Sequence, residues 1–155
     1  MTEGKTRKRI ATNKRARHEY HILEKLEAGI VLVGTEVKSL RQGKVTMTDA
    51  FAALKDGEVW LFNLHISPFE KGNRFNHDPR RPRKLLLHSR EIEKLIEKTE
   101  EKGLTIVPLD LYFLGGRVKC EIGVVRGKKL HDKRATSAER TAKREIDRVL
   151  KEANR

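Results

Sequence analysis

Apolar and polar positions alternate along several short stretches of the chain, which is the pattern of half-buried β-strands. From Tyr20 to Leu32, every second position is apolar except Glu24, and this two-residue period predicts a strand. Asp56-Gly57 separates two apolar runs within residues 49–66 and is a preferred pair for a type I′ turn, because both turn positions need a positive φ. A second hairpin is predicted over residues 105–125, turning at Gly115-Gly116.

The second strand of that later hairpin also predicts the role of the single cysteine. Val118, Cys120, Ile122 and Val124 alternate on one face, so Cys120 is interpreted as a small core residue and not as a nucleophile. A single cysteine excludes an intrachain disulfide framework and fits a reducing compartment. We therefore expect a cytoplasmic protein.

Two segments carry helix signals instead. In residues 35–43, Thr35 is the expected N-cap and Gly43 the expected end. In residues 89–103, Ser89 is the expected N-cap and Gly103 the stop. The inner stripe of this second helix is predicted to consist of Ile92, Leu95, Ile96 and Thr99.

Between the hairpins, residues 67–88 contain three prolines and are expected to form mostly an irregular loop, with a strand recovered at residues 84–88. Five or six strands, with two hairpins and two helical connections, predict a mainly β chain. We expect a small closed β-barrel of the oligonucleotide-binding (OB) type with about three flanking helices.

Charge is concentrated at the two ends of the chain. Residues 1–17 hold seven Lys/Arg and one acid, and residues 128–155 hold ten Lys/Arg and five acids, so the ends supply +11 of the net +13. Basic arms attract polyanions, most commonly nucleic acid. An anionic membrane is the alternative, but it would need an apolar face that both arms lack. We see no signal peptide and no apolar run long enough to span a bilayer.

Catalytic and metal-binding motifs are not found. The histidines of HEYH, His18 and His21, are one residue too close for the helical zinc motif, and no third ligand is identifiable. GKK at residues 127–129 lacks the glycine pattern of a phosphate loop. We expect no cofactor, no metal and no enzyme activity. A catalytic pair among the scattered histidines and acids is the alternative.

Basic clusters support the nucleic-acid interpretation. One cluster lies beside Tyr20 at residues 14–17, and another lies at residues 36–44 with Lys38, Arg41 and Lys44. RRPRK at residues 80–84 is equally compatible with an ordinary solvated surface. Aromatic residues make up only 5% of the chain, which disfavours a single-strand binder that stacks a row of bases. A folded RNA, read by its shape, its backbone and a few loop bases, is the expected partner.

The last 28 residues are predicted to bury nothing of their own. One narrow helical stripe contains Ala142, Ile146, Val149, Leu150 and Ala153. An isolated helix of this length is marginal, so this tail is expected to be disordered when free and to fold on a partner. A solubility tail is the alternative. The predicted organisation is a flexible basic arm over 1–12, an RNA-binding barrel over 13–127 and the basic tail over 128–155.

Four motifs closely resemble one bacterial family. NKRARHEY, EAGIVLVGTEVKSLRQGK, RKLLLHSREI and GKKLHDKR stand in order from Asn13 onwards and resemble small protein B, also called SsrA-binding protein. The loop 69–77 and the first twelve residues match no pattern of the family. The resemblance implies an OB-type barrel that binds the tRNA-like domain of transfer-messenger RNA (tmRNA). It also implies delivery with elongation factor Tu to stalled ribosomes, without enzyme activity. A ribosomal or rRNA-binding OB-fold protein that works without tmRNA is the alternative.

The resemblance also implies particular residues. Its RNA contacts are Asn13, Glu27 and Leu86, where the Glu27 carboxylate accepts from base amino groups or 2′-hydroxyls, or alternatively pairs with a nearby Lys or Arg. Further RNA-contact candidates are Lys14, Arg17, Tyr20, Lys38, Arg41, Lys84, Lys128 and Lys129. In the tail, which the resemblance places as a helix in the mRNA channel near the decoding centre, the ribosome-contact candidates are His131, Asp132, Lys133, Arg134, Val149 and Leu150. Ala142 stands where some relatives carry an aromatic residue.

Overall fold

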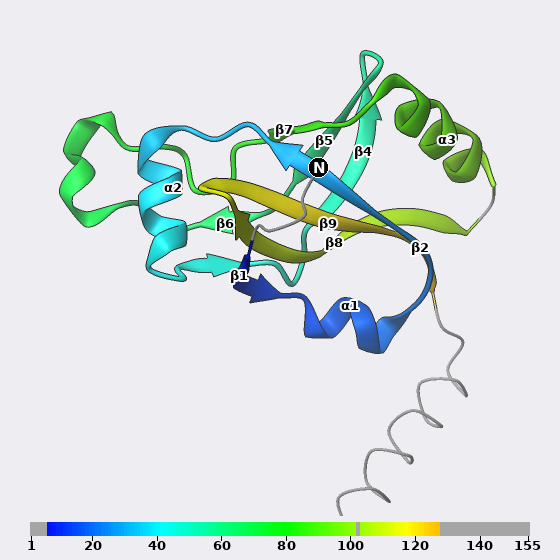
Figure 1. Ribbon diagram of the computed structural model, residues 1–155, viewed down its shortest axis with the longest axis horizontal. Coiled ribbons are helices and arrows are strands. Elements are labelled where there is room, and N and C mark those ends of the chain that lie inside the picture. Colours follow the sequence, from blue (N-terminus) through cyan, green and yellow to red (C-terminus); the bar gives the residue numbers. More distant parts are fainter. Residues whose placement is uncertain (1–5, 102, 128–155) are drawn as a thin grey trace, which may run out of the picture.

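The fold is built mainly from antiparallel β-strands, as the alternating pattern predicts. The computed structural model describes residues 6–101 and 103–127 (Figure 1). The strands are β1 (Arg7–Thr12), β2 (Tyr20–Ile30), β3 (Val45–Thr46), β4 (Phe51–Lys55), β5 (Glu58–Phe62), β6 (His65–Ile66), β7 (Arg83–Leu86), β8 (Leu104–Leu114) and β9 (Arg117–Gly127). The helices of this described part are α1 (Lys14–Glu19), α2 (Gly34–Arg41), α3 (Ser89–Glu100) and a short 3₁₀ helix, η1 (Glu70–Phe75).

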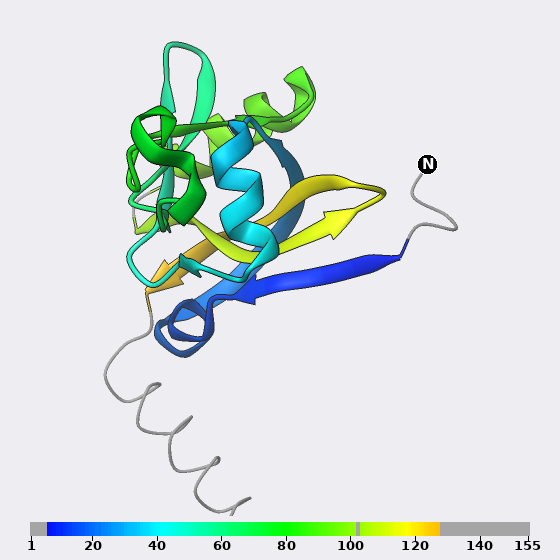
Figure 2. The ribbon, with the colours of Figure 1, turned by 90° about the vertical axis from the view of Figure 1, so that its left-hand side faces the viewer.

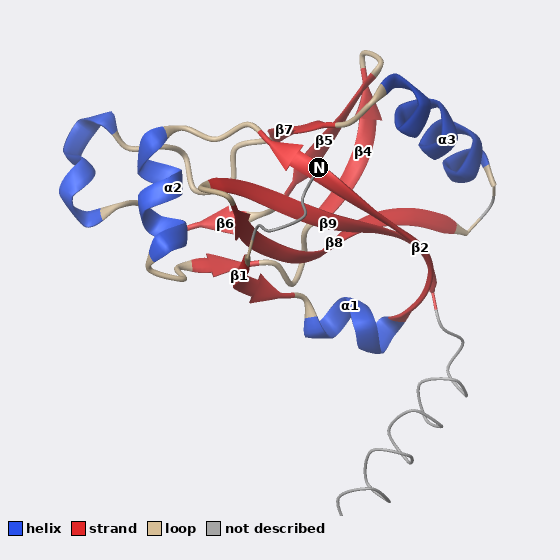
Figure 3. Ribbon diagram, in the orientation of Figure 1, coloured by secondary structure: helices blue, strands red, loops and turns tan. Residues whose placement is uncertain are grey.

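Hydrogen bonds connect six of the strands into a ring. The order is β8-β4-β5-β7-β2-β9, and β9 pairs back onto β8 (Figure 3). Three joints of the ring are short: β4 meets β8 at Ala52↔Ile106, β5 meets β7 over two residue pairs, and β2 meets β7 at Gly29↔Leu86 and Ile30↔Leu85. The long β8–β9 hairpin is thus the central element of the fold, and the short strands β4, β5 and β7 complete the ring around it.

The main core fills the inside of this ring. Val118, Cys120, Ile122 and Val124 are all buried there, which confirms the predicted inner face of β9. A smaller cluster packs α1 on the outer side of β8, where Ala16 meets Val107, Leu109 and Val125. The helix α1 is therefore fixed to the ring by its own apolar contact.

Both predicted hairpin turns are confirmed. Asp56 and Gly57 have φ angles of 54° and 77°, and Gly115 and Gly116 have φ angles of 58° and 82°. All four residues lie in the left-handed region that a type I′ turn requires.

The expected N-caps are wrong by one residue or two. The helix α2 begins after Val33, because the Glu36 carboxylate accepts the Val33 N–H at 2.8 Å. Thr35 lies inside the first turn and its hydroxyl contacts Nδ1 of His77 at 2.9 Å. The helix α3 likewise begins after His88, whose N–H is accepted by Glu91 at 2.9 Å. In both helices the glutamate at the third position satisfies the free backbone donor.

Two further differences concern the ends of the predicted elements. Leu95 of α3 is buried, but Ile96 is 37% exposed, so the inner stripe of this helix is narrower than expected. The loop 67–88 contains η1, and β7 begins at Arg83, one residue before the expected strand.

The basic N-terminal segment differs most from its prediction. Residues 1–12 were expected to form a flexible arm, but Arg7–Thr12 forms β1, which pairs with β8 from Arg7↔Leu114 to Thr12↔Asp110. Figure 2 shows this strand running alongside the protruding β8–β9 hairpin. The half of β8 beyond its contact with β4 leaves backbone groups open, and β1 satisfies them. No helix in the described ranges has the length and apolar character needed to span a bilayer.

Candidate nucleic-acid interface

An exposed leucine marks a hollow on the outer face of β2, β7 and β9. Gly29 of β2 pairs with Leu86 on one side and with Lys119 on the other. A Cβ at Gly29 would lie 3.1 Å from the Cβ of Leu86, so glycine permits this close approach. Leu86 is nevertheless 53% exposed, which is unusual for a large aliphatic residue in a strand and is typical of a contact surface.

Two adjoining hollows of about 350 and 240 Å³ share Gly29, Leu86 and Lys119. We call this region the Leu86 surface and define it by Glu27, Gly29, Leu86, His88, Arg117 and Lys119. The structure therefore brings together two of the predicted RNA contacts, Glu27 and Leu86, from strands 59 positions apart in the sequence.

The Glu27 carboxylate is held by two donors. Nη2 of Arg7 lies 3.2 Å from Oε2, and the hydroxyl of Tyr112 donates to the same oxygen. Arg7 also lies over the Tyr112 ring, 4.4 Å from its centroid. Burial, together with this hydrogen bond to Glu27, raises the pKa of Tyr112. The alternative prediction, an ion pair of Glu27 with a nearby arginine, is thus confirmed, and the carboxylate remains 29% exposed.

The positive surface continues past the β8–β9 turn. A further hollow of about 370 Å³ is lined by Lys8, Arg9, Arg41 and the apolar side chains of Ile10, Leu40 and Phe113. It shares Gly116 with the smaller of the two hollows at Leu86. Arg41, an RNA-contact candidate, therefore lies beside this surface. Lys38 on the same helix is exposed, with Nζ 5.4 Å from the centroid of the Phe69 ring.

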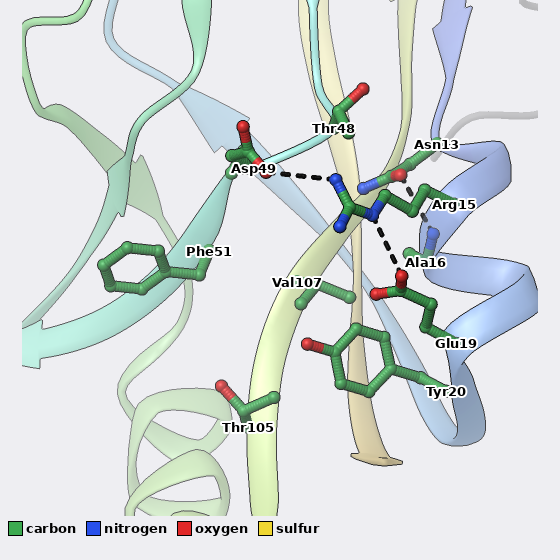
Figure 4. A pocket seen from close by; sticks show the side chains of 11 residues that line it. Asn13, Arg15, Ala16, Glu19, Tyr20, Thr48, Asp49, Phe51, Thr105 and Val107 are labelled. Atoms are coloured by element: carbon green, nitrogen blue, oxygen red, sulfur yellow. Dashed lines mark hydrogen bonds and ion pairs between the residues drawn. The ribbon is translucent and has the colours of Figure 1, made fainter. Parts of the chain in front are cut away.

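Asn13 has a different environment from the other RNA-contact candidates. Its side chain is 3% exposed and caps α1, with Oδ1 accepting the Ala16 N–H at 3.1 Å (Figure 4). Nδ2 donates to the carbonyls of Pro108 at 2.9 Å and Met47 at 3.3 Å. Asn13 is thus engaged inside the protein and fixes the position of α1.

The candidates on α1 form a separate group. Lys14 is exposed, Arg17 pairs with Asp110 of β8 at 3.2 Å, and Tyr20 opens β2. Glu27 lies seven positions after Tyr20 along β2, which is roughly 23 Å of strand. The structure therefore does not bring this group to the Leu86 surface.

Two arginines of the RRPRK segment, Arg81 and Arg83, form ion pairs with Glu36. Arg83 is fully buried and its Nε lies 2.6 Å from Oε2 of Glu36, while Nη2 of Arg81 lies 2.5 Å from Oε1. Lys84 lies 3.7 Å from Glu58 and keeps 37% exposure. The segment does not form one surface cluster, because Arg83 is buried, Arg81 is 29% exposed and pairs with Glu36, and Arg80 is exposed.

The buried Glu36 carboxylate between these arginines has a pKa below its ordinary value. Burial alone would raise the pKa of Glu36, but hydrogen bonds from Arg81 and the Val33 N–H, with the charge of Arg83, outweigh burial and hold that pKa below its ordinary value. The carboxylate thus stays ionised in the interior.

Several surface cations were missed from the sequence. Arg117 and Lys119 alternate along β9 with the core residues Val118 and Cys120. Their outward positions follow from that alternation, but their closeness to Leu86 depends on the strand order. Lys8 and Arg9 were assigned to the flexible arm and belong to β1 instead.

The described residues hold no cluster of three or more potential metal ligands. Cys120 is fully buried, and burial raises the pKa of its thiol. The candidates Lys128, Lys129, His131, Asp132, Lys133, Arg134, Val149 and Leu150 lie outside the described residues.

A small ring of antiparallel strands with surface cations around an exposed apolar side chain is typical of nucleic-acid-binding proteins. Within that class the family is clear. The model of the SmpB protein family matches residues 10–152, and the chain belongs to this family.

The sequence is similar to those of its relatives over nearly its whole length. The chain is 61% identical over 142 residues to the SsrA-binding protein of Carboxydothermus hydrogenoformans, covering 92% of this chain and 95% of that one. It is 60% identical over 153 residues to the SsrA-binding protein of Syntrophomonas wolfei, covering 99% and 98%. A solved structure described as "tmRNA-SmpB: a journey to the center of the bacterial ribosome" is 58% identical, with a TM-score of 0.67 over 77% of this chain and 85% of that one.

Proposed function

We propose that this protein binds SsrA RNA, the tmRNA, and acts with it in trans-translation on the ribosome. The observation that carries this conclusion is membership of the SmpB family over residues 10–152. The protein is a non-enzymatic RNA-binding adaptor. Its contribution to ribosome rescue is recognition and placement of the RNA.

The Leu86 surface is the proposed contact for the tRNA-like domain of tmRNA. Glu27 accepts hydrogen bonds from base amino groups or 2′-hydroxyls, since Arg7 and Tyr112 already orient its carboxylate. Leu86 offers an apolar contact to a base or ribose. Lys119, Arg117 and Arg41 neutralise phosphates, together with the other lysines of the candidate set, Lys14, Lys38, Lys84, Lys128 and Lys129.

The finer assignments belong to the same proposal. We assign the ring of strands to the OB-type barrel and residues 13–127 to tmRNA binding. Residues 128–155, with their net charge of +5, become helical in the empty mRNA channel near the decoding centre. There His131, Asp132, Lys133, Arg134, Val149 and Leu150 contact the ribosome, and elongation factor Tu shares the delivery complex.

The test is a gel-shift of the purified protein against tmRNA at physiological salt, with total tRNA as the competitor. Binding that survives the competitor supports the tmRNA adaptor. Binding that any RNA removes equally would favour the alternative of an rRNA-binding protein that works without tmRNA.

A charge reversal locates the surface in the same assay. Lys119→Glu should lower tmRNA affinity about tenfold or more, because it replaces a phosphate partner with a repelling charge. Lys55→Glu makes the same change in net charge at the exposed end of β4 and should have a much smaller effect. Equal effects of the two variants would mean that net charge alone, and not the Leu86 surface, sets the affinity.

A further inference from the structure

A separate pocket lies on the molecule at α1, away from the Leu86 surface. It has a volume of about 360 Å³ and is formed between α1, the segment before β4, and β8. Figure 4 shows its principal side chains, Arg15, Glu19, Tyr20, Asp49, Phe51 and Val107. This volume is near the lower end of the range for ligand sites, so the pocket suits one small group and not a helix or a strand.

One edge of the pocket is formed by an exposed aromatic side chain. Phe51 is 40% exposed and is stacked on Phe62, with ring centroids 5.5 Å apart and an interplanar angle of 25°. Tyr20 and the buried Val107 also line the pocket, whereas the Phe51 ring lies at its edge and points away from both (Figure 4). The stack on Phe62 fixes the orientation of the Phe51 ring. A fixed and exposed ring is what a planar base requires for stacking.

The polar side of the pocket is acidic. Nε of Arg15 lies 3.0 Å from Glu19, and Nη1 lies 3.4 Å from Oδ1 of Asp49. Two carboxylates thus offset one guanidinium, which disfavours a phosphate group inside the pocket. The Asp49 side chain is 72% exposed, and a carboxylate has about four acceptor positions, so it has capacity for donors from a ligand.

We propose that this pocket binds one unpaired RNA base that carries an exocyclic amino group. The base stacks against Phe51, and its amino group donates to Asp49. Adenine, cytosine and guanine have such a group, whereas uracil does not. This inference rests on the proposed RNA-binding function and adds a base-specific site to it.

The experiment measures binding of the full chain to RNA octamers by fluorescence anisotropy. The octamers are all uridine except for the central base, which is A, C, G or U. The three octamers with an amino-bearing base should bind about tenfold more tightly than the all-uridine octamer, the value expected for one good base contact.

Two variants separate stacking from hydrogen bonding. Phe51→Leu should weaken binding of the amino-bearing octamers about tenfold, since it removes the stacking surface. Asp49→Asn should abolish most of the preference over uracil, because an amide can also donate to the uracil carbonyl. Trp60→Leu is the control: Trp60 lies on the same hairpin as Phe51 but does not line the pocket, and it should leave binding unchanged.

The outcomes are distinct. Equal binding of all four octamers by the unchanged protein would overturn the proposal, as would an equal loss from Trp60→Leu and Phe51→Leu in proteins with the same melting curve. Because the Asp49 side chain is largely exposed, Asp49→Asn should leave folding unchanged, and its result tests binding alone. Failure of the proposed function would be visible separately, as absent binding of the tRNA-like domain by the unchanged protein.

Discussion

Glu27 illustrates how a single acid can serve a protein that binds an acidic partner. The pair with Arg7 and the hydrogen bond from Tyr112 fix one of its oxygens. The group is therefore pre-organised, and binding an RNA donor costs little additional ordering. Its negative charge is partly offset by Arg7, which also reduces repulsion of nearby phosphates.

We predict that Glu27→Gln weakens tmRNA binding even though it removes a negative charge. The loss should be about tenfold, because one oriented charged acceptor is replaced by an amide. Titration of tmRNA at fixed salt measures it, with Glu93→Gln on the exposed side of α3 as the control. Tighter binding by Glu27→Gln would show that electrostatic attraction dominates and that Glu27 has no orienting role.

Gly57 is required by its backbone angle and not by its surroundings. Its φ is +77° and nothing lies within 4 Å of a Cβ built there. Gly57→Ala should lower the free energy of unfolding by about 1–2 kcal/mol, the cost of a side chain in the left-handed region. Gly34→Ala, also in open space but without a positive φ, should have no such cost in urea unfolding. A neutral Gly57→Ala would refute the strain argument.

Glu36 connects three elements through one carboxylate. It accepts the N–H of Val33 at the start of α2, and it pairs with Arg81 in the loop and Arg83 in β7. Arg83 also donates to the carbonyls of Leu64 and Pro79. The helix that carries Lys38 and Arg41 is thereby held against the strand that carries Leu86.

We predict that Glu36→Gln lowers the free energy of unfolding by about 3–5 kcal/mol, because it leaves the guanidinium of Arg83 buried without its counter-charge. Glu58→Gln removes the partner of Lys84 in a pair that is largely exposed and should cost less than about 1 kcal/mol. Urea unfolding at pH 7 measures both. Equal small losses would mean that the buried pair adds nothing to stability.

Acid should destabilise the protein through the same carboxylate. The pKa of Glu36 is held below its ordinary value of 4.5 in the folded protein, so the unfolded chain binds the proton more readily. This contribution is present above about pH 4.5 and is lost as the pH falls through the lower folded pKa. Between about pH 5 and pH 3, the melting temperature should fall more steeply for the unchanged protein than for Glu36→Gln. Parallel curves would contradict the assignment.

At the scale of the molecule, β2 separates two regions. The Leu86 surface lies near one end of this strand, and α1 lies at the other. Tyr20, at the α1 end, pairs with Gly127, the last described residue. The described chain therefore ends at the α1 end of β2 and away from the Leu86 surface, which supports separate contacts for tmRNA and for the ribosome.

We predict that truncation after Gly127 leaves most tmRNA binding intact but abolishes tagging of incomplete proteins. A tmRNA gel-shift and a tagging assay on ribosomes stalled without a stop codon measure the two properties. The truncated chain retains the whole ring and the Leu86 surface. A large loss of tmRNA affinity would contradict the two-part division.

Much of the fold could be predicted from local sequence patterns. Asp56-Gly57 and Gly115-Gly116 predicted both hairpins, and the alternation around Cys120 predicted the inner face of β9, because turn angles and strand period are properties of neighbouring residues. The strand β1 was not predicted. RKRIAT has no apolar alternation, and its pairing depends on the open half of β8, about 100 positions away in the sequence.

The candidate site divides in the same way. Glu27 and Leu86 were identified from motifs, whereas Lys119 and the inward direction of Arg81 and Arg83 were not. The sequence by itself determined the strand period, the turns, the basic ends and the family motifs, since each is written in adjacent residues. Only the tertiary structure decided which cations reach the surface and which pair with Glu36. It alone also brought Phe51 and Tyr20 to the same pocket, because those choices depend on strand order and burial across the whole chain.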